Sequence, residues 1–314
     1  MRAVVVREYG GPEALRIVET PLPEPGPGQV RIKVEAAAVN IVDVATRIGM
    51  MTSAGLVAAR PEHGLGWDVA GTVDASQVPG FAPGDRVAAL SDRLDRSTAA
   101  YAEYIVLDAG AVAHIPGSLG FAEAATIPLN GLTALQGLDL LAGFGLAPGD
   151  TLLVTGAAGA VGGYAVELAA LRGLRVVAVA GPDDEKQVRA FGAEHFVPRQ
   201  EELGEAVRAV VPGGVDGALD AAAIGVRALD AVRNGGSLAA VLDHAAPPAL
   251  RGTRVAKVWV RADGRQLAEL IRLVEQGRLT TRVAGTLPLA RAGEAQERLA
   301  AGGVRGRLVL LPQV

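Results

Sequence analysis

The sequence predicts an α/β protein that combines a β-rich, barrel-like part with a doubly wound parallel sheet. Two observations support this prediction. Up to about residue 120, short valine-rich runs alternate with proline and glycine turns at 21–28, 79–80 and 83–85, which is typical of a small β domain. From residue 121 to about 260 the pattern changes to helices that alternate with buried apolar strands, which is typical of a parallel sheet.

The second part contains four apolar runs that we expect to form neighbouring parallel strands, at residues 152–155, 176–180, 217–221 and 238–242. A ligand of such a sheet binds at the carboxyl ends of its strands. Beyond residue 260, the apolar spacing predicts helices over 266–276 and 292–301 and a closing strand over 308–311. We therefore expect one domain formed by residues 1–120 and 261–314 and a second domain formed by residues 121–260.

The most specific motif is a strand that runs directly into a glycine-rich turn and then into a helix. Glycines stand at 156, 159 and 162, and the helix that follows carries apolar residues over 165–171. Such a turn lets the backbone approach a pyrophosphate, whose charge then faces the N–H groups at the start of the helix. We expect the following residues to bind a dinucleotide: Gly156, Ala157, Ala158, Gly159, Ala160, Val161 and Gly162.

Composition excludes several function classes. The formal net charge is -4 and there is no run of five or six like charges, which argues against a nucleic-acid partner. No apolar stretch approaches the length of a membrane span, so we expect no membrane partner and a cytoplasmic location. The sequence has no cysteine, which excludes disulfides and thiolate catalysis. Because the four histidines lack the spacing of metal ligands, we expect no metal site.

Several further motifs occur in a fixed order along the chain. They are Asn40-Ile41-Val42-Asp43 with Arg47-Ile48-Gly49, Gly66-Trp67-Asp68-Val69-Ala70-Gly71-Thr72-Val73, Gly84-Asp85-Arg86-Val87, Tyr101-Ala102-Glu103-Tyr104, the stretch 127–134 and the stretch 304–310. With these motifs the chain resembles, nearly from end to end, the zinc-independent quinone oxidoreductases of the medium-chain dehydrogenase/reductase superfamily. The resemblance implies a GroES-like barrel, completed by the residues from about 260 onward, and a Rossmann domain that binds NADP, with cofactor and substrate in the cleft between them.

The chain also departs in three places from the pattern of the family that it resembles. Zinc-dependent relatives carry cysteine and histidine ligands near Asn40 and Trp67, and this sequence has neither, so catalysis would proceed without a Lewis-acid metal. Some relatives place a tyrosine two residues after the Asn-x-x-Asp motif, where this chain has Ala45. Ala160 replaces a second consecutive glycine, which the turn tolerates if φ stays negative at that residue.

The resemblance places Asn40, Asp43 and Thr133 at the catalytic site, with Asn130 and Thr133 also beside the cofactor. Each has a structural alternative. Asn40 and Asp43 are typical turn-forming residues that bond their own backbone, and Thr133 could bond within its helix. Asp68 could be purely structural. Trp67, Tyr101 and Trp259 are the candidates for stacking against a flat acceptor, and any of them could instead belong to the core.

The expected cofactor is NADPH. An NAD-selective fold usually has an acidic residue at the end of its second strand, and here Ala180 and Gly181 stand there, followed by Lys186 and Arg199. These two cations could neutralise a 2′-phosphate, although Asp183, Asp184 or Glu185 could turn toward a ribose and Lys186 could simply be solvated. Leu242 and His244 follow the strand 238–242 and are expected beside the nicotinamide, with a solvent-facing His244 as the alternative.

The resulting hypothesis is an enzyme that uses NADPH to reduce a quinone or another conjugated enone. One alternative is an enoyl or 2-alkenal reductase of a biosynthetic pathway, and another is a non-catalytic NADPH-binding sensor. Residues 253–260 alternate apolar and polar side chains after the last expected parallel strand. In the family that the chain resembles, edge strands of two subunits pair, which predicts a homodimer through this segment. The alternative is a monomer whose edge is protected by Arg254 and Lys257.

Overall fold

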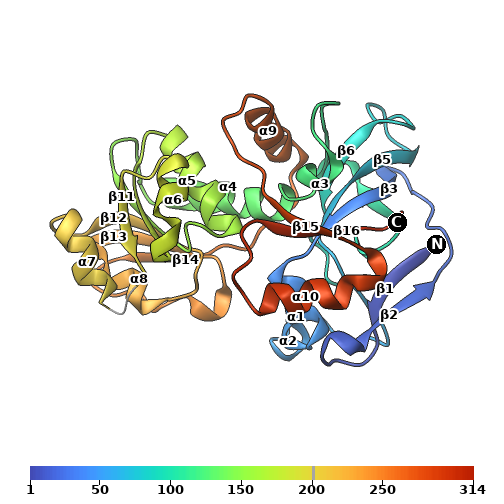
Figure 1. The fold of residues 1–314 in the computed structure, drawn as a ribbon, viewed down its shortest axis with the longest axis horizontal. Helices are drawn as coiled ribbons and strands as arrows, with labels where there is room; N and C mark the ends of the chain where they lie inside the picture. The colour runs from blue at the N-terminus through green and yellow to red at the C-terminus, as the bar shows by residue number, and fades with distance from the viewer. Residues whose placement is uncertain (200–201) are drawn as a thin grey trace. The chain divides into compact units, whose positions relative to one another are not determined.

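The structure is a computed structural model that describes residues 1–199 and 202–314 (Figure 1). It divides into two compact units, one formed by Met1–Leu129 with Arg261–Val314 and the other by Asn130–Val260. The first boundary therefore lies after residue 129 and not after residue 120 as expected. The reason is that α3 (Phe121–Ala124) contacts β3 (Gln29–Ala38) and β5 (Asp68–Ser76), which belong to the first unit.

In its described residues the first unit contains a three-stranded sheet in the order β2-β1-β4 and a seven-stranded sheet in the order β15-β16-β3-β5-β6-β8, with β7 paired to β3. The closing strand β16 (Arg307–Leu311) lies between β15 (Val283–Pro288) and β3, so the end of the chain completes a sheet begun by its start. The other elements of this unit are β1 (Arg2–Val6), β2 (Leu15–Glu19), β4 (His63–Gly64), β6 (Arg86–Leu90), β7 (Tyr104–Asp108), β8 (Val112–His114), α1 (Ile41–Arg47), α2 (Met50–Ser53), α9 (Gly264–Glu275) and α10 (Ala292–Ala300).

The core of the first unit follows from the two-residue alternation of its strands. In β3, Val30, Ile32 and Val34 are fully buried while the residues between them are partly exposed. At Gly71 of β5 an added Cβ would overlap the carbonyl oxygen of Lys33, so only glycine allows the two strands to approach where their register shifts.

The second unit contains a six-stranded sheet, in the described residues, in the order β11-β10-β9-β12-β13-β14, and every neighbouring pair is parallel. The expected strands at 152–155, 176–180, 217–221 and 238–242 appear as the four central strands, and the helix expected over 165–171 begins earlier, at Ala160. The strands are β9 (Thr151–Thr155), β10 (Arg175–Ala180), β11 (His195–Pro198), β12 (Val215–Asp220), β13 (Val232–Ala240) and β14 (Arg254–Lys257), and the helices are α4 (Pro128–Gly143), α5 (Ala160–Leu171), α6 (Glu185–Ala190), α7 (Leu203–Val210) and α8 (Val226–Asp230).

Burial explains why these strands could be recognised. All residues of β9 are buried, and β10 is buried from its second residue onward, because a parallel sheet is usually covered on both faces. The strand β14 is itself the last parallel strand and forms one edge of the sheet, so the segment 253–260 does not follow the last strand as expected but contains it. No helix in the described ranges is long and apolar enough to cross a membrane.

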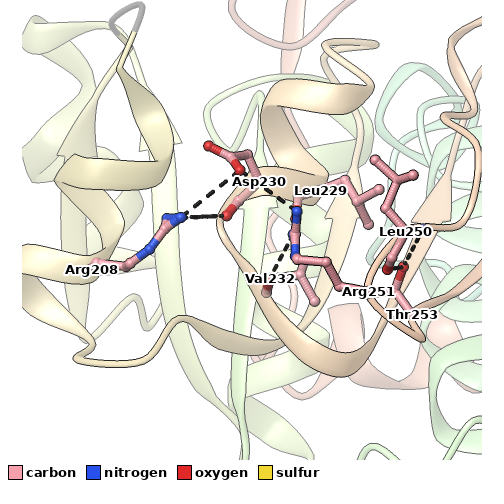
Figure 2. A network of polar contacts seen from close by, with 7 residues as sticks. All are labelled: Arg208, Leu229, Asp230, Val232, Leu250, Arg251 and Thr253. Atoms are coloured by element: carbon pink, nitrogen blue, oxygen red, sulfur yellow. Dashed lines mark hydrogen bonds and ion pairs between the residues drawn. The ribbon is translucent and has the colours of Figure 1, made fainter.

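Two arginines, Arg208 of α7 and Arg251 of the turn before β14, donate to backbone carbonyl groups at and after the end of α8 (Figure 2). Arg251 has a positive φ of 54°, and its Nη2 donates to the carbonyl oxygens of Leu229 (2.8 Å) and Val232 (3.2 Å). Arg208 donates from both Nη atoms to the carbonyl oxygen of Asp230, at 3.1 and 3.0 Å. These bonds satisfy carbonyl groups at and after the end of α8, which the helix itself leaves without partners. The turn before the edge strand is therefore held to the body of the sheet.

Candidate active site

The glycine-rich turn joins β9 to α5 and uses its glycines for different purposes. Gly156 has a φ of +61°, a conformation that glycine adopts without the strain of a side chain. An added Cβ at Gly162 would overlap the carbonyl oxygen of Gly156 and lie 2.7 Å from its carbonyl carbon. Gly159 has an ordinary φ of −74°, and an added Cβ there would lie 3.0 Å from the same oxygen. Gly156 and Gly162 therefore shape the turn, and Gly159 leaves room on its exposed side.

The turn presents the start of α5 at the carboxyl end of β9. Gly159 is exposed, Ala160 and Val161 are partly exposed, and Ala157 and Ala158 are buried. Ala160 has no positive φ, which is the condition under which alanine is tolerated at this position. Because the helix spans Ala160–Leu171, its N-terminal dipole favours a negatively charged group at this turn. The space that missing side chains leave and the helix start together fit a pyrophosphate.

The residues expected to contact the adenosine ribose of the cofactor lie at and after the end of β10. Ala180 is the last residue of the strand, and the backbone N–H of Gly181 donates to Asp184 Oδ2 at 3.1 Å. Asp184 is buried, and its carboxylate is engaged by the backbone of this turn. Arg199 donates its backbone N–H to the carbonyl oxygen of Ala180 at 2.8 Å, which places it directly beside the end of β10.

Lys186 lies on α6, shortly after this turn. The side chains of Lys186 and Arg199 are exposed, and neither makes an ion pair within the described part of the chain. By contrast, Arg189 on the same helix is paired with Glu185 at 2.8 Å. Lys186 and Arg199 thus offer two available positive charges beside the end of β10.

The residues predicted beside the nicotinamide follow β13. This strand ends at Ala240, two residues before the expected end, so that Leu242 and His244 lie in the segment after it. Leu242 is partly exposed and His244 is exposed. Parallel strands end at one edge of a sheet, and these residues are therefore at the same edge as the glycine turn.

Asn130 and Thr133 lie three residues apart on α4 and therefore on one face of that helix. Both are buried. Further along α4, Gly137 packs against the sheet, since an added Cβ there would lie 2.6 Å from Leu219 Cδ1 on β12. The helix that carries the two candidate residues is therefore held closely to a central strand of the second unit.

Asn40 and Asp43 belong to a buried polar network in the first unit. Asp43 is fully buried, and its Oδ2 accepts hydrogen bonds from Tyr101 Oη at 2.9 Å and from the backbone N–H of Asn40 at 2.8 Å. Its Oδ1 accepts from the backbone N–H of Gly66 at 2.9 Å. Three donors thus converge on one carboxylate, which joins the start of α1 to the segment before β5.

Asp68 extends the network. Its Oδ2 accepts from Asn40 Nδ2 at 2.7 Å, and its Oδ1 accepts from the backbone N–H of Leu129 at 2.6 Å, in the first turn of α4. Asn40 Nδ2 also donates to the carbonyl oxygen of Ala38 at 3.4 Å, so both of its amide hydrogens have acceptors inside the unit. These contacts give Asp68 a structural role, because its carboxylate connects Asn40, at the start of α1, to the first turn of α4.

Burial has the largest effect on the pKa values of the two carboxyl groups in this network. It raises the pKa of Asp43 to about 6 and that of Asp68 to about 7, although the hydrogen bonds that each carboxylate accepts act in the opposite direction. Burial and the neighbouring carboxylate of Asp43 likewise raise the pKa of Tyr101. The bond from Tyr101 to Asp43 could not be inferred from the sequence, where Tyr101 was only a candidate for stacking or for the core.

The three aromatic candidates for stacking have different surroundings. Tyr101 is fully buried and Trp67 is buried, so both belong to the core of the first unit. Trp259 is 48% exposed. Of the three, only Trp259 is exposed.

No three histidine, cysteine, aspartate or glutamate side chains come together as metal ligands in the described ranges. Three of the four histidines make separate local contacts. His63 Nε2 is bonded to Tyr9 Oη at 2.9 Å, His114 stacks on Phe81, and His195 lies beside Glu194.

Two family models match the chain. The alcohol dehydrogenase GroES-like domain matches residues 26–132, and the zinc-binding dehydrogenase model matches residues 191–310. A chloroplastic quinone oxidoreductase, QR1 of Triphysaria versicolor, is 30% identical over 332 residues that cover 99% of this chain and 98% of that protein. Other quinone oxidoreductases are among the related sequences and structures.

Solved structures show the same fold over the whole chain. A protein described as an NAD-dependent alcohol dehydrogenase has a TM-score of 0.83 at 34% identity, and the match covers 99% of each chain. A mycobacterial protein solved in complex with NADPH has a TM-score of 0.82 at 29% identity, covering 99% of this chain and all of that one. These matches confirm the predicted combination of a GroES-like domain with a Rossmann-type parallel-sheet domain. The chain therefore belongs to the quinone oxidoreductase-like family of the medium-chain dehydrogenase/reductase superfamily.

Proposed function

We propose that the protein is an NADPH-dependent reductase of quinones or other conjugated enones that works without zinc. The glycine turn between β9 and α5 carries this proposal, because its missing side chains and the helix start fit the pyrophosphate of a dinucleotide. Membership of a family of quinone oxidoreductases supports the acceptor class. When bound, the nicotinamide supplies the hydride, and the protein supplies binding, orientation and electrostatics.

The residues of the chain then have separate tasks. Gly156–Gly162 hold the pyrophosphate, and Thr133 with Asn130 holds the nicotinamide end. Asn40 is the catalytic candidate in the first unit, and its amide is oriented by Asp68, to which it donates at 2.7 Å. Asp43 is fully buried and therefore has an indirect role: it accepts hydrogen bonds from the backbone N–H groups of Asn40 and Gly66 and so holds these two segments in place.

Activity assays decide between this function and its alternatives. We expect NADPH oxidation with a panel of quinones or with a panel of simple enones. Turnover limited to enoyl thioesters or 2-alkenals would favour the biosynthetic reductase. Tight NADPH binding without turnover on any panel would favour the sensor.

The preference for NADPH rests on charge at the end of β10. No carboxylate is available there at Ala180 or Gly181, Asp184 is engaged by the backbone of Gly181, and Lys186 and Arg199 are exposed cations. A 2′-phosphate would find two positive partners at this place, while a bare ribose hydroxyl would not find its usual acidic partner. The neighbour solved with NADPH supports the same choice, whereas the neighbour described as an NAD-dependent alcohol dehydrogenase does not, so the charges beside β10 carry the preference.

Replacing Lys186 by alanine is expected to weaken NADPH binding about tenfold or more and to leave NADH binding nearly unchanged, because a charge-assisted phosphate contact contributes on the order of 1.5–3 kcal/mol. Fluorescence titration of both cofactors measures this. Arg189→Ala is the matched control, since Arg189 lies on the same helix and is already paired with Glu185. Equal losses for the two cofactors in Lys186→Ala would show that the lysine does not bind the phosphate.

Activity is expected to survive exhaustive dialysis against a chelator. The chain has no cysteine, and Asn40, Trp67 and Asp68 stand near the positions where zinc-dependent relatives carry ligands. Metal analysis of the purified protein accompanies the assay. Stoichiometric zinc whose removal abolishes activity would refute this prediction.

The protein is further proposed to form a homodimer through β14, which pairs with only one strand, β13, among the residues that the structure describes. The backbone N–H of Val258 donates inward to Ala240 at 2.8 Å, so the N–H of the preceding residue, Lys257, points to the free edge. Lys257→Pro is therefore expected to convert a dimer to a monomer, because proline has no N–H to donate. Lys257→Ala keeps the N–H and should remain dimeric by light scattering. A monomeric wild type, or a dimer in all three proteins, would exclude this interface.

A further inference from the structure

A buried pair of side chains joins the ends of the two central strands of the second unit. Thr155 is the last residue of β9, Asp220 is the last residue of β12, and the two are direct partners in the strand register. Both are fully buried, and Thr155 Oγ1 donates to Asp220 Oδ1 at 2.6 Å. Neither residue belongs to the glycine turn.

The same pair holds the loop that follows β12, residues 221–225. Asp220 Oδ1 accepts from the backbone N–H of Ile224 at 3.2 Å, and Oδ2 accepts from that of Gly225 at 2.7 Å. Thr155 Oγ1 accepts from the backbone N–H of Ala222 at 3.0 Å. The loop is thus bonded to two buried side chains at its start and at its end.

This loop is strained and lies against the glycine turn. Ala223 has a positive φ of 56°, which is rare for a residue other than glycine. An added Cβ on Gly156 would lie 3.3 Å from the Cβ of Ala222 and 3.4 Å from the carbonyl oxygen of Ala221. Strain of this kind persists only where surrounding contacts impose it, and it is concentrated at ligand sites. The imposing contacts here are those of Asp220 and Thr155.

The position of the loop indicates which ligand it meets. The chain leaves β9 toward β10 and β11 and then returns to β12 on the other side of β9, so the strand order reverses between β9 and β12. In doubly wound sheets the dinucleotide lies across this point, with one mononucleotide on each half of the sheet. Lys186 and Arg199 are on the half of β10 and β11, and loop 221–225 begins the half of β12 and β13.

We propose that Thr155 and Asp220 are positioning residues which hold the backbone of loop 221–225 in place to bind the nicotinamide mononucleotide half of the cofactor. This rests on the proposed function as a dinucleotide-dependent reductase. Because both side chains are fully buried and all three of their oxygens are engaged, they act through the loop and do not touch the cofactor.

Thr155→Val tests the proposal, because it keeps the shape of the side chain and removes the hydroxyl. Binding is measured for NADPH and for 2′,5′-ADP, which carries the adenosine half with its 2′-phosphate and has no nicotinamide. We expect Thr155→Val to weaken NADPH about tenfold and to leave 2′,5′-ADP within about twofold. Thr155→Ser, which keeps the hydroxyl, should restore NADPH binding. Equal effects on both ligands, or no effect on either, would overturn the proposal.

Asp220→Asn provides a second variant, and Asp216→Asn is its matched control at the other end of β12. Asp216 accepts from the backbone N–H of Thr151 at 2.8 Å and pairs with Arg233 at 2.7 Å, so its replacement perturbs the same strand away from the loop. Only Asp220→Asn should lower the ratio of NADPH to 2′,5′-ADP affinity. A wild type that binds neither ligand would refute the proposed function, whereas a wild type that binds both beside unaffected variants would refute only the role of the pair.

Discussion

Asp43→Ala is expected to lower the free energy of unfolding by at least about 3 kcal/mol, because it leaves three buried donors without an acceptor. These donors are Tyr101 Oη and the backbone N–H groups of Asn40 and Gly66. Urea denaturation measures the change. Asp85→Ala is the control, since that carboxylate accepts one backbone N–H, from Ala82, in an exposed turn. A loss for Asp43→Ala no larger than that of the control would show that the network contributes little to stability.

The pH dependence of stability gives a second measurement on the same residue. Burial raises the pKa of Asp43 from 3.8 to about 6, so the folded state binds a proton more tightly than the unfolded state. The free energy of unfolding should therefore decrease as the pH rises from about 4 to about 6, by on the order of 3 kcal/mol for this group, and then level off. Asp43→Asn has no ionisable group there and should lack this part of the decrease. Parallel curves for the wild type and Asp43→Asn would contradict the raised pKa.

Gly162→Ala is expected to weaken NADPH binding at least about tenfold and to lower the free energy of unfolding by about 1–3 kcal/mol, as overpacking does. The added Cβ would overlap the carbonyl oxygen of Gly156, so α5 must move away from the turn that binds the pyrophosphate. Gly143→Ala is the control, because Gly143 ends α4 with open space around its Cβ position and should be neutral or slightly stabilising. Cofactor titration and thermal melts provide both readouts. Unchanged NADPH affinity in Gly162→Ala would exclude the turn as the binding site.

The three glycines of the turn differ in ways that the structure shows and the sequence does not. The sequence presents Gly156, Gly159 and Gly162 as equivalent members of one motif. In the structure Gly156 adopts a positive φ and Gly162 meets a backbone carbonyl, whereas Gly159 has an ordinary φ and an exposed side. A substitution at Gly159 meets only the carbonyl oxygen of Gly156, at 3.0 Å, and therefore disturbs the turn less than one at Gly162, whose Cβ would overlap that oxygen.

The sequence alone determined the fold class, the family and the four central strands of the second unit, because buried parallel strands are continuous apolar runs and a glycine turn has a fixed spacing. Strand β11 was not predicted from the sequence, and residues 253–260 were not predicted to lie within the parallel sheet. Strand β11 is short and only partly buried, and the exposed alternation of β14 is the pattern of an edge. Such strands are determined by their neighbours more than by their own residues.

Only the tertiary structure decided which polar side chains act together. Asp43 meets Tyr101 across 58 positions of sequence, and Thr155 meets Asp220 across 65, and neither pair has a local pattern that could reveal it. The sequence places Asp68 within the motif 66–73 and shows no partner for it, whereas in the structure its two oxygens join Asn40 to the first turn of α4. The periodicity of a sequence indicates which face of its own helix or strand a residue occupies. Buried hydrogen bonds between distant segments form only when the folded chain brings those segments together.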